Sequence, residues 1–180
     1  MSPVGDILSD RLLQPVEGPR TARLRLRPFV AADLDAYAAM CADPEVMAHI
    51  GSGGPVGRDI AWRQMAMFNG EWTLRGYGQW AIERLADGAL LGRAGFLHPE
   101  GWPGNELGWL LARDAWGQGY ASEAVRAARD FGRARLGVTD LISLIRPANL
   151  RSIALAQRIG AVLERETDFF GGPARVYRHP

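Results

Sequence analysis

Lysine is absent from the 180-residue sequence, so all 21 basic side chains are arginines. Without a lysine the chain can form no Schiff base with a carbonyl substrate, and it lacks the Gly-Lys-Ser/Thr phosphate loop of nucleotide triphosphatases. Cysteine is nearly absent too, because Cys41 stands alone and can form neither an internal disulfide nor a thiolate metal cluster. A single thiol favours a reducing, cytoplasmic setting.

The sequence also lacks a surplus of one charge and a long apolar run. The 21 basic residues are balanced by 20 acidic ones, so bulk charge gives no support for a nucleic-acid partner. No stretch approaches the ~18 apolar residues of a membrane span, and the charged start of the chain does not form the apolar core of a signal peptide. The three histidines lack the spacing of metal ligands. We therefore expect a cytoplasmic protein with no metal, membrane or nucleic-acid partner.

What is present is the composition of an ordinary globular protein, with 47% hydrophobic and 23% charged residues. A chain of this length corresponds to about one domain at the usual ~100 to 200 residues each. We expect residues 1–20 to form a flexible N-terminal extension and residues 21–180 to form a single domain.

The first part of this domain combines a strand with helices. Residues 21–27 alternate apolar and arginine side chains, which is the pattern of a half-buried strand. Apolar residues spaced by three and four predict helices over residues 31–42 and 58–72, with a glycine-rich loop between them. Cys41 lies on the apolar stripe of the first helix and is most simply a small buried side chain.

Three extended segments follow, and the turns between them predict an antiparallel meander. Asp87-Gly88 separates the first two segments and tolerates the positive φ of a tight hairpin. The pattern then changes to a helix after a glycine loop, a β-branched strand, a short helix and two short extended pieces. In chain order these elements are expected at residues 78–85, 89–98, 106–111, 121–136, 140–145, 149–159, 161–166 and 174–177.

The loop Gly117-Gln118-Gly119 joins the third strand of the meander to a helix, and this combination can bind an anion. Glycines let backbone N–H groups approach a ligand, and the helix N-terminus adds unpaired donors and the positive end of its dipole. A pyrophosphate would fit such a site without a lysine. An equally weighted interpretation is a tight strand-to-helix turn that binds nothing.

A dinucleotide fold is a rival interpretation of the same loop. Gly117, Gly119 and Ser122 nearly match the dinucleotide fingerprint, and Asp140 lies about twenty residues on. In that fold the glycine loop follows the first parallel strand and the acidic residue follows the second. Here the loop follows an antiparallel meander and Asp140 precedes its strand, so topology argues against a nicotinamide oxidoreductase.

Short motifs are spread along the chain in a specific order and spacing. They are Leu24-Arg25-Leu26-Arg27-Pro28-Phe29, Leu91-Gly92-Arg93-Ala94-Gly95, Glu106-Leu107-Gly108-Trp109, Trp116-Gly117-Gln118-Gly119-Tyr120-Ala121-Ser122-Glu123-Ala124, and Asn149-x-x-Ser152 followed by Arg158-Ile159-Gly160. Together they resemble the GNAT superfamily of N-acetyltransferases, and most closely its RimJ/RimL-like branch of ribosomal-protein alanine N-acetyltransferases. The resemblance covers nearly all of residues 21–177.

The resemblance implies a fold, a co-substrate and a reaction. The fold is α/β (α+β), with helices flanking a mixed, mostly antiparallel, V-shaped central sheet. Acetyl-CoA is expected in the cleft of the V, and its acetyl group passes to a primary amine by direct attack. Residues 21–180 would then be the acetyltransferase domain, acting as a monomer or homodimer.

The resemblance also assigns residues to acetyl-CoA. Asn149 is placed on the pantetheine arm and Ser152 near the CoA chain, although both residue types are also good helix caps. Arg113 and Arg158 could pair with the 3′-phosphate or could simply be solvated. Backbone amides are expected to bind the pyrophosphate at Gly117, Gln118, Gly119, Tyr120 and Ala121, and the pantetheine is expected to lie along Trp109, Leu110 and Leu111.

Two residues are candidates for the chemistry. An amine must be neutral to attack, so a carboxylate reached through a water is the expected proton acceptor, and Glu106 is the candidate. Its alternative interpretation is a solvent-facing glutamate of a strand. A backbone N–H on the same strand would stabilise the oxyanion. Ser152, a water, or direct departure of a thiolate of pKa ~8.5 could serve at the leaving thiol.

The sequence departs from the family pattern at two positions. Most relatives outside this branch begin the pyrophosphate motif with Gln or Arg, whereas this chain has Trp116, so no side-chain donor comes from this position. Many also carry a tyrosine seven residues after the asparagine as the acid for the thiolate, whereas this chain has Ala156. The acid is therefore left unassigned.

The acceptor amine is left open by the sequence. Its specificity is expected to come from loops 46–57 and 168–175. Aromatic side chains could line an apolar-walled pocket or could simply pack in the core. A protein N-terminus, a polyamine, an amino acid or an aminoglycoside-like amine would each suit the same core, and a non-catalytic acyl-CoA-binding sensor is an alternative to an enzyme. The aromatic candidates are Phe169, Phe170, Trp62, Trp72 and Trp80.

Overall fold

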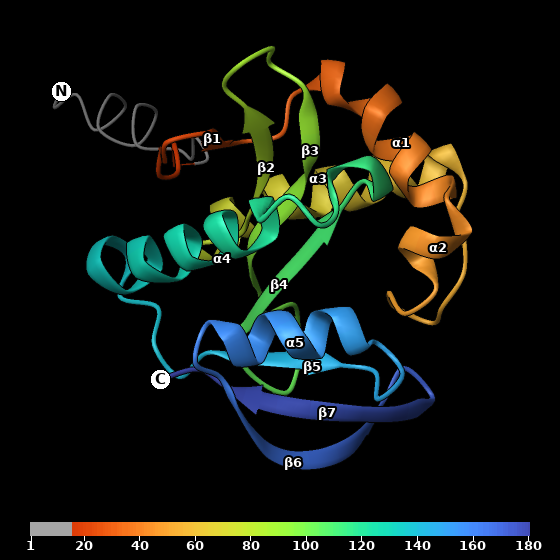
Figure 1. Ribbon diagram of the computed structural model, residues 1–180, viewed down its shortest axis with the longest axis vertical. Helices are drawn as coiled ribbons and strands as arrows, with labels where there is room; N and C mark the ends of the chain where they lie inside the picture. Colours follow the sequence, from red (N-terminus) through yellow and green to blue (C-terminus); the bar gives the residue numbers. More distant parts are fainter. Residues whose placement is uncertain (1–15) are drawn as a thin grey trace, which may run out of the picture.

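Within residues 16–180, which the computed structural model describes, seven strands form one mixed sheet in the order β1-β2-β3-β4-β5-β7-β6 (Figure 1). Helices cover both of its faces. The strands are β1 (Leu24–Arg27), β2 (Gln79–Arg84), β3 (Leu90–Leu97), β4 (Glu106–Leu111), β5 (Ile142–Ile145), β6 (Val162–Phe169) and β7 (Gly172–Arg178). The α-helices are α1 (Leu34–Ala42), α2 (Pro44–Met47), α3 (Arg58–Arg75), α4 (Tyr120–Phe131) and α5 (Leu150–Arg158).

The first half of the sheet is the predicted antiparallel meander. β2 pairs with β3, and β3 pairs with β4, each in antiparallel register, while β1 adds antiparallel to β2. The hairpin turns where Asp87-Gly88 predicts it, with Gly88 at a φ of 73° and the Arg84 N–H donating to the Ala89 carbonyl at 2.9 Å. The third predicted strand, residues 106–111, matches β4 residue for residue.

The sheet splits between β4 and β5. These two strands run parallel and pair only at Glu106 and Ile142, close to where each strand starts. Beyond that pair they diverge (Figure 1), and β5 continues by pairing antiparallel with β7. The predicted V-shaped, mostly antiparallel sheet is therefore confirmed, and the opening of the V exposes one edge of β4.

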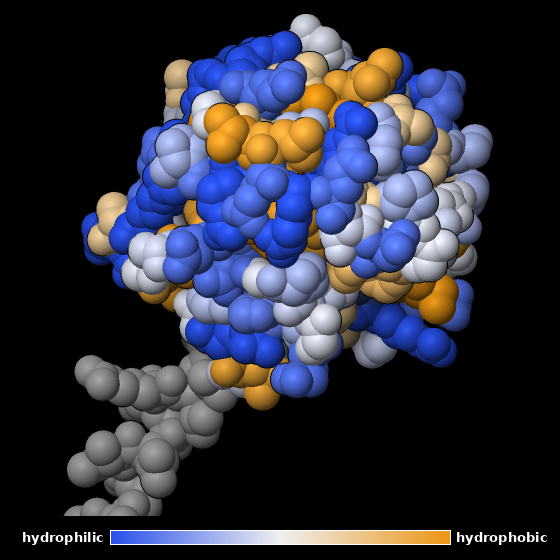
Figure 2. Space-filling view, turned by 90° about the horizontal axis from the view of Figure 1, so that it is seen from below, coloured by the Kyte–Doolittle hydropathy of each residue, from blue (hydrophilic) through white to orange (hydrophobic). Residues whose placement is uncertain are grey.

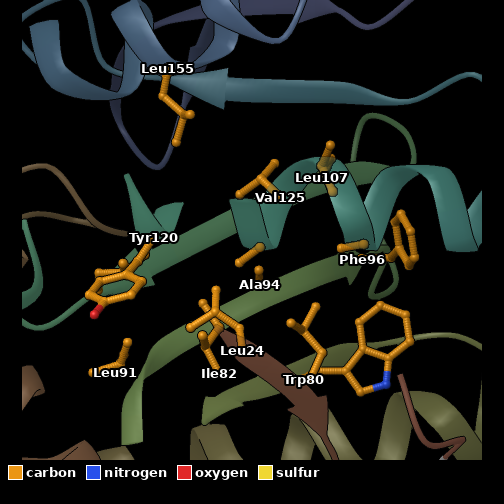
Figure 3. Packing of buried hydrophobic residues seen from close by; sticks show 14 of the residues in the cluster. Leu24, Trp80, Ile82, Leu91, Ala94, Phe96, Leu107, Tyr120, Val125 and Leu155 are labelled. Atoms are coloured by element: carbon orange, nitrogen blue, oxygen red, sulfur yellow. The ribbon is translucent and has the colours of Figure 1, made fainter. Parts of the chain in front are cut away.

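Two apolar layers fill the space between the sheet and its helices. On one face α4 packs against β1, β3 and β4, and Figure 3 shows side chains of these elements converging around Trp80 and Phe96. The centroid of the Trp80 ring lies 5.9 Å from that of Phe96, at an interplanar angle of 70°, and 4.8 Å from that of Trp72, at 50°. On the other face α1 and α3 bury Tyr37, Cys41 and other side chains. Cys41 is fully buried, as its apolar stripe predicts.

Several element ends differ from the predictions. The helix expected over residues 31–42 begins as a 3-10 turn and becomes α1 at Leu34. The short helix α2 was not predicted; it begins because the Asp43 side chain accepts from the Glu45 and Val46 N–H groups and proline occupies its first turn. After Phe131, α4 continues as one π-helical turn, and both C-terminal strands are longer than expected.

The predicted extension 1–20 falls mostly outside the described residues, because the description begins at Val16. The part that is described packs along β1. The Gly18 N–H donates to the Leu26 carbonyl at 3.0 Å, and the Trp80 indole donates to the Val16 carbonyl at 2.7 Å. Figure 2 shows the face at the far end of the sheet, beyond β6, where hydrophilic residues predominate with apolar patches between them.

Gly92 of β3 marks the tightest strand contact. It has a φ of 150°, and a Cβ atom there would lie 2.0 Å from the Leu110 carbonyl oxygen. We expect Gly92→Ala to lower the free energy of unfolding by about 3 kcal/mol or more, because overpacking adds to an unfavourable φ. Urea denaturation measures the change.

Gly70→Ala is the matched control, because this glycine lies inside α3 and an added Cβ would meet nothing within 4 Å. We expect it to raise stability by roughly 0.5–1 kcal/mol. An unchanged denaturation midpoint for Gly92→Ala would contradict the packing of β3 on β4.

Candidate active site

Two adjoining cavities occupy the opening of the V. The larger, of about 750 Å³, runs from the end of β4 past the glycine loop to α5, and we call it the groove. The smaller, of about 340 Å³, lies on the α3 side of the sheet near the turn between β6 and β7, and we call it the pocket. The two share wall residues, which are His49, Ile50, Trp109, Asn149 and Ser152.

The N-terminus of α4 forms one end of the groove. Gly117 and Gly119 have φ angles of 74° and 81°, which only glycine adopts without strain, and they turn the chain sharply from β4 into the helix. In the part of the chain that the structure describes, no side chain caps Gly119, so the first N–H groups of α4 are available to a ligand. A Cβ at Gly117 would meet nothing within 4 Å. The open loop and the helix dipole together suit a pyrophosphate.

Arginine side chains line or flank this end of the groove. The Arg151 guanidinium carbon lies 3.9 Å above the Trp116 ring, and the Trp116 indole donates to the Leu111 carbonyl at 3.0 Å. Trp116 therefore holds an arginine where relatives carry a polar side chain, and sequence reasoning missed Arg151. Arg158 also lines the groove, and its guanidinium donates to the Ser122 hydroxyl at 3.3 Å.

Three residues assigned to the cofactor do not line the groove with their side chains. Arg113 turns to α2, where it forms ion pairs with Asp43 at 3.2 Å and Glu45 at 2.5 Å. Gln118 donates to the Asp114 carbonyl, and Tyr120 is buried in the core. The placement of Gln118 and Tyr120 is therefore compatible with the predicted role of their backbone N–H groups, but not with a role for their side chains.

The edge of β4 that faces the split carries backbone donors. Ala112 donates to β3, whereas the Leu107 carbonyl accepts from the Ser143 hydroxyl of β5, so the odd-numbered residues of β4 direct their backbone groups toward β5. Trp109 and Leu111 lie on this edge beyond the last pair with β5. Leu110 and Leu111 also line the groove. The edge can therefore offer N–H groups to an extended ligand.

Asn149 and Ser152 meet Trp109 across the split. The Asn149 side chain accepts from the Ser152 N–H at 3.2 Å, so it caps α5 as its residue type predicts. The Ser152 hydroxyl accepts from the Trp109 indole at 3.2 Å, which leaves its own proton free to donate. This contact places a hydroxyl donor at the junction of the groove and the pocket.

Glu106 lies at the start of β4 and lines the pocket. Its carboxylate is partly buried and accepts from the Trp102 indole at 2.7 Å. Burial raises the pKa of Glu106 to about 7, although the Trp102 hydrogen bond and the positive charge of Arg93 act in the opposite direction. A carboxyl that titrates near neutral pH can accept a proton from an amine and release it again. The interpretation as a solvent-facing strand glutamate does not match this position.

Aromatic rings and an arginine form the outer wall of the pocket. Trp102 packs on Phe169 and Phe170, with ring centroids 4.7 Å and 5.4 Å apart. Arg146 donates to the carbonyls of Gly51 at 3.0 Å and Phe170 at 3.3 Å, and so ties loops 46–57 and 168–175 together. Of the other candidate aromatics, Trp72 and Trp80 lie in the core and Trp62 is exposed.

Sequence reasoning missed Trp102, Arg146 and Arg93 as pocket residues. Arg93 carried a usable signal, because it is the one charged residue in an otherwise apolar strand. Arg146 carried none, since its partners lie far away in the sequence. Among residues 16–180, no group of three or more histidine, cysteine or acidic side chains is placed to bind a metal, and none of the helices has the length and apolarity of a membrane crossing.

Comparisons with known proteins agree with this architecture. The profile of the family described as "Acetyltransferase (GNAT) domain" matches residues 23–162. YkkB of Bacillus subtilis, an uncharacterised protein, is 30% identical over 162 residues, which cover 87% of this chain and 92% of YkkB.

Solved structures show the same fold. The crystal structure of an acetyltransferase from Agrobacterium tumefaciens is 34% identical, with a TM-score of 0.82 over 95% of this chain and 98% of that chain. RimL, a ribosomal alpha-N-protein acetyltransferase crystallised with coenzyme A, is 17% identical and has a TM-score of 0.75 over 91% of this chain and 97% of that chain. The match of the family profile and these similarities confirm the predicted resemblance. The chain belongs to the GNAT family of acetyltransferases.

Proposed function

We propose that this protein transfers the acetyl group of acetyl-CoA to a primary amine, with acetyl-CoA in the groove and the amine in the pocket. The observation that carries the proposal is the junction of the two cavities at Trp109 and Ser152, with Glu106, whose pKa burial raises to about 7, three residues before Trp109 on β4 and lining the pocket. RimL, which shares the fold, was crystallised with coenzyme A. A protein N-terminus and a small-molecule amine both suit this arrangement.

The groove supplies binding for the three parts of acetyl-CoA. The N–H groups at the start of α4 would bind the pyrophosphate, with Arg151 and Arg158 adding positive charge nearby. The split edge of β4 would bind the amides of the pantetheine in the manner of an added strand. The thioester carbonyl would then accept a hydrogen bond from the Trp109 or Leu111 N–H, which stabilises the oxyanion that forms during attack.

Proton movement completes the reaction. The neutral amine attacks the thioester carbon, the new C–N bond forms as the C–S bond breaks, and the amine proton passes to Glu106 directly or through a water. The Ser152 hydroxyl, which lies beside Trp109 at the end of the pantetheine path, gives its proton to the departing thiolate and takes one from a water, so the serine stays protonated. Ser152 thereby takes the place of the tyrosine that Ala156 replaces, and Glu106 releases its proton to solvent.

Titration with acetyl-CoA and a thiol-release assay test this proposal together. Calorimetry should show saturable binding of acetyl-CoA and none of NADH, and thiol should be released in an amine-dependent manner. Binding without thiol release from any amine would favour an acyl-CoA sensor. Absence of acetyl-CoA binding by folded protein would contradict the proposed groove.

The Glu106→Gln variant tests the base. We expect kcat/KM for the amine to fall by roughly 10² or more, while acetyl-CoA affinity stays unchanged, because the carboxylate touches only the acceptor side. In the wild type Glu106 is protonated below its pKa of about 7, so kcat/KM calculated on the concentration of neutral amine should rise about tenfold per pH unit up to that value and then bend. The variant should lose this bend.

Glu100→Gln is the matched control, because Glu100 is a fully exposed glutamate in the turn that precedes β4. We expect its kcat/KM and its pH profile to match those of the wild type. A Glu106→Gln enzyme with full activity and an unchanged bend would remove Glu106 from the mechanism.

The Ser152→Ala variant tests the acid. We expect kcat to fall about tenfold to a hundredfold, since general acids contribute 10²–10⁴ and a thiolate is a tolerable leaving group. The KM for acetyl-CoA should change little, and a co-substrate with a more acidic thiol should restore most of the rate. An unchanged kcat would assign thiolate departure to water or to no acid.

The Arg146→Met variant tests how the pocket wall is held. Its lost hydrogen bonds to two loops should raise the KM for the amine several-fold, at roughly 1 kcal/mol for each hydrogen bond. The calorimetric affinity for acetyl-CoA should not change, because Arg146 does not line the groove. Hydrogen exchange should become faster in residues 51–57 and 168–173. An unchanged KM would show that these loops do not shape the acceptor site.

A further inference from the structure

Arg93 is a buried cation at the inner end of the pocket. Its side chain lies on the α3 side of β3, is 7% exposed and lines the pocket. One guanidinium nitrogen donates to Gln79 at 3.1 Å, and the guanidinium carbon lies 4.9 Å from the centre of the Phe68 ring. Among residues 16–180 no carboxylate forms an ion pair with Arg93, and its Nε atom has no partner. A buried charge without a counter-ion is costly to a fold, so this cation calls for an explanation.

A second donor without a partner lies beside it. Gln79 is fully buried, and its carboxamide oxygen accepts from Arg93, which leaves its Nε2 atom without a partner. Gly95 pairs with Gly108 between β3 and β4, so neither of these two positions contributes a side chain to this part of the sheet. A Cβ at Gly108, which lines the pocket, would lie 3.3 Å from the Gln79 Nε2 atom. Two buried donor nitrogens at the floor of the pocket, Arg93 Nε and Gln79 Nε2, therefore make no hydrogen bond within residues 16–180.

The base and the cation share one face of the sheet. Glu106 pairs with Leu97 and Arg93 pairs with Leu110, so the two side chains point the same way from positions four residues apart along β3. This separation corresponds to about 13 Å between backbone positions, which the two side chains shorten by leaning into the pocket. The positive charge of Arg93 is close enough to lower the pKa of Glu106.

The other charged groups near the pocket each have at least one hydrogen-bond partner, although the second carboxylate oxygen of Glu71 has none among residues 16–180. Arg146 donates to carbonyl oxygens at the outer wall. Glu71 is buried, and one of its carboxylate oxygens accepts from the His98 N–H at 3.2 Å. Burial raises the pKa of Glu71, while the hydrogen bond from the His98 N–H and the charge of Arg75 act in the opposite direction.

We propose that the acceptor amine carries a carboxylate, and that Arg93 and Gln79 bind this carboxylate while the amine lies near Glu106. This inference rests on the proposed acetyl transfer to an amine in the pocket. The distance between Arg93 and Glu106 selects molecules in which several bonds separate the amine from the carboxylate, such as a short peptide or an ω-amino acid. A polyamine or an aminoglycoside brings further positive charge beside Arg93 and is disfavoured. The aromatic wall of Trp102, Phe169 and Phe170 suits an apolar side chain on the same molecule.

A matched pair of acceptors tests the proposal: the dipeptide phenylalanyl-glycine with a free carboxylate, and phenylalanyl-glycinamide, which has the same α-amine and lacks the charge. We expect the wild type to use the carboxylate with a kcat/KM at least tenfold higher than that for the carboxamide. Arg93→Met should remove this preference by lowering activity on the carboxylate alone, and Arg93→Lys should retain part of it. Arg63→Met, an exposed arginine on α3, is the control and should keep the preference. Equal use of the two dipeptides by the wild type, or an equal loss on both in Arg93→Met, would overturn the proposal.

Two further measurements keep the proposal open to refutation. The reaction product N-acetyl-phenylalanyl-glycine should bind to the wild type at least tenfold more tightly than its carboxamide, and Arg93→Met should abolish the difference. Failure of both products to bind, or equal binding of the two, would overturn the proposal.

The melting temperature of Arg93→Met should equal or exceed that of the wild type, because a buried charge without a counter-ion is removed. A large drop would instead assign Arg93 a structural role. Acetyl-CoA titration of the same samples separates the two claims. Absence of acetyl-CoA binding counts against the proposed function, whereas acetyl-CoA binding without any preference for the carboxylate overturns this inference alone.

Discussion

The single residue pair that joins β4 to β5 is the constraint on which the site depends. Because pairing between β4 and β5 ends after one residue pair, the edge of β4 beyond it stays open, while the opposite edge of β5 pairs with β7 along its whole length. The loop after β4 then turns through Gly117 and Gly119 into α4, so a free strand edge and a free helix N-terminus face the same groove. Apolar layers on both faces of the sheet hold this opening in place.

The electrostatics of the opening divide it into regions with different chemistry. Arginines and helix N–H groups make the groove suited to anions. The carboxyl of Glu106 lies where burial raises its pKa, and the indole of Trp102 orients it. Arg93 and Gln79 place buried donors at the inner end of the pocket. The phosphate-bearing co-substrate and the carboxylate-bearing amine that we propose would thus have separate binding regions, which meet at Trp109 and Ser152.

Local patterns predicted the parts of the fold that local interactions determine. The hairpin at Asp87-Gly88, β4 and the glycine loop follow from turn chemistry and periodicity, and the order of the motifs was specific enough to indicate the family. Contacts between distant segments were not predictable. Arg113 lies in an ion pair with α2, a helix too short to show periodicity, and Arg146 binds carbonyls of two loops. Such partners depend on the folded chain, so the side chains that complete the pocket were found only in the structure.

Hydrogen exchange with and without coenzyme A tests most directly the claim that the split of the sheet is the co-substrate site. Coenzyme A should slow exchange at the same time on the free edge of β4, residues 109–111, and at the start of α4, residues 119–122, because one ligand spans both. Hydrogen exchange in β2, which is paired on both edges, should not change. Protection confined to another surface, or no protection at saturating coenzyme A, would contradict the account.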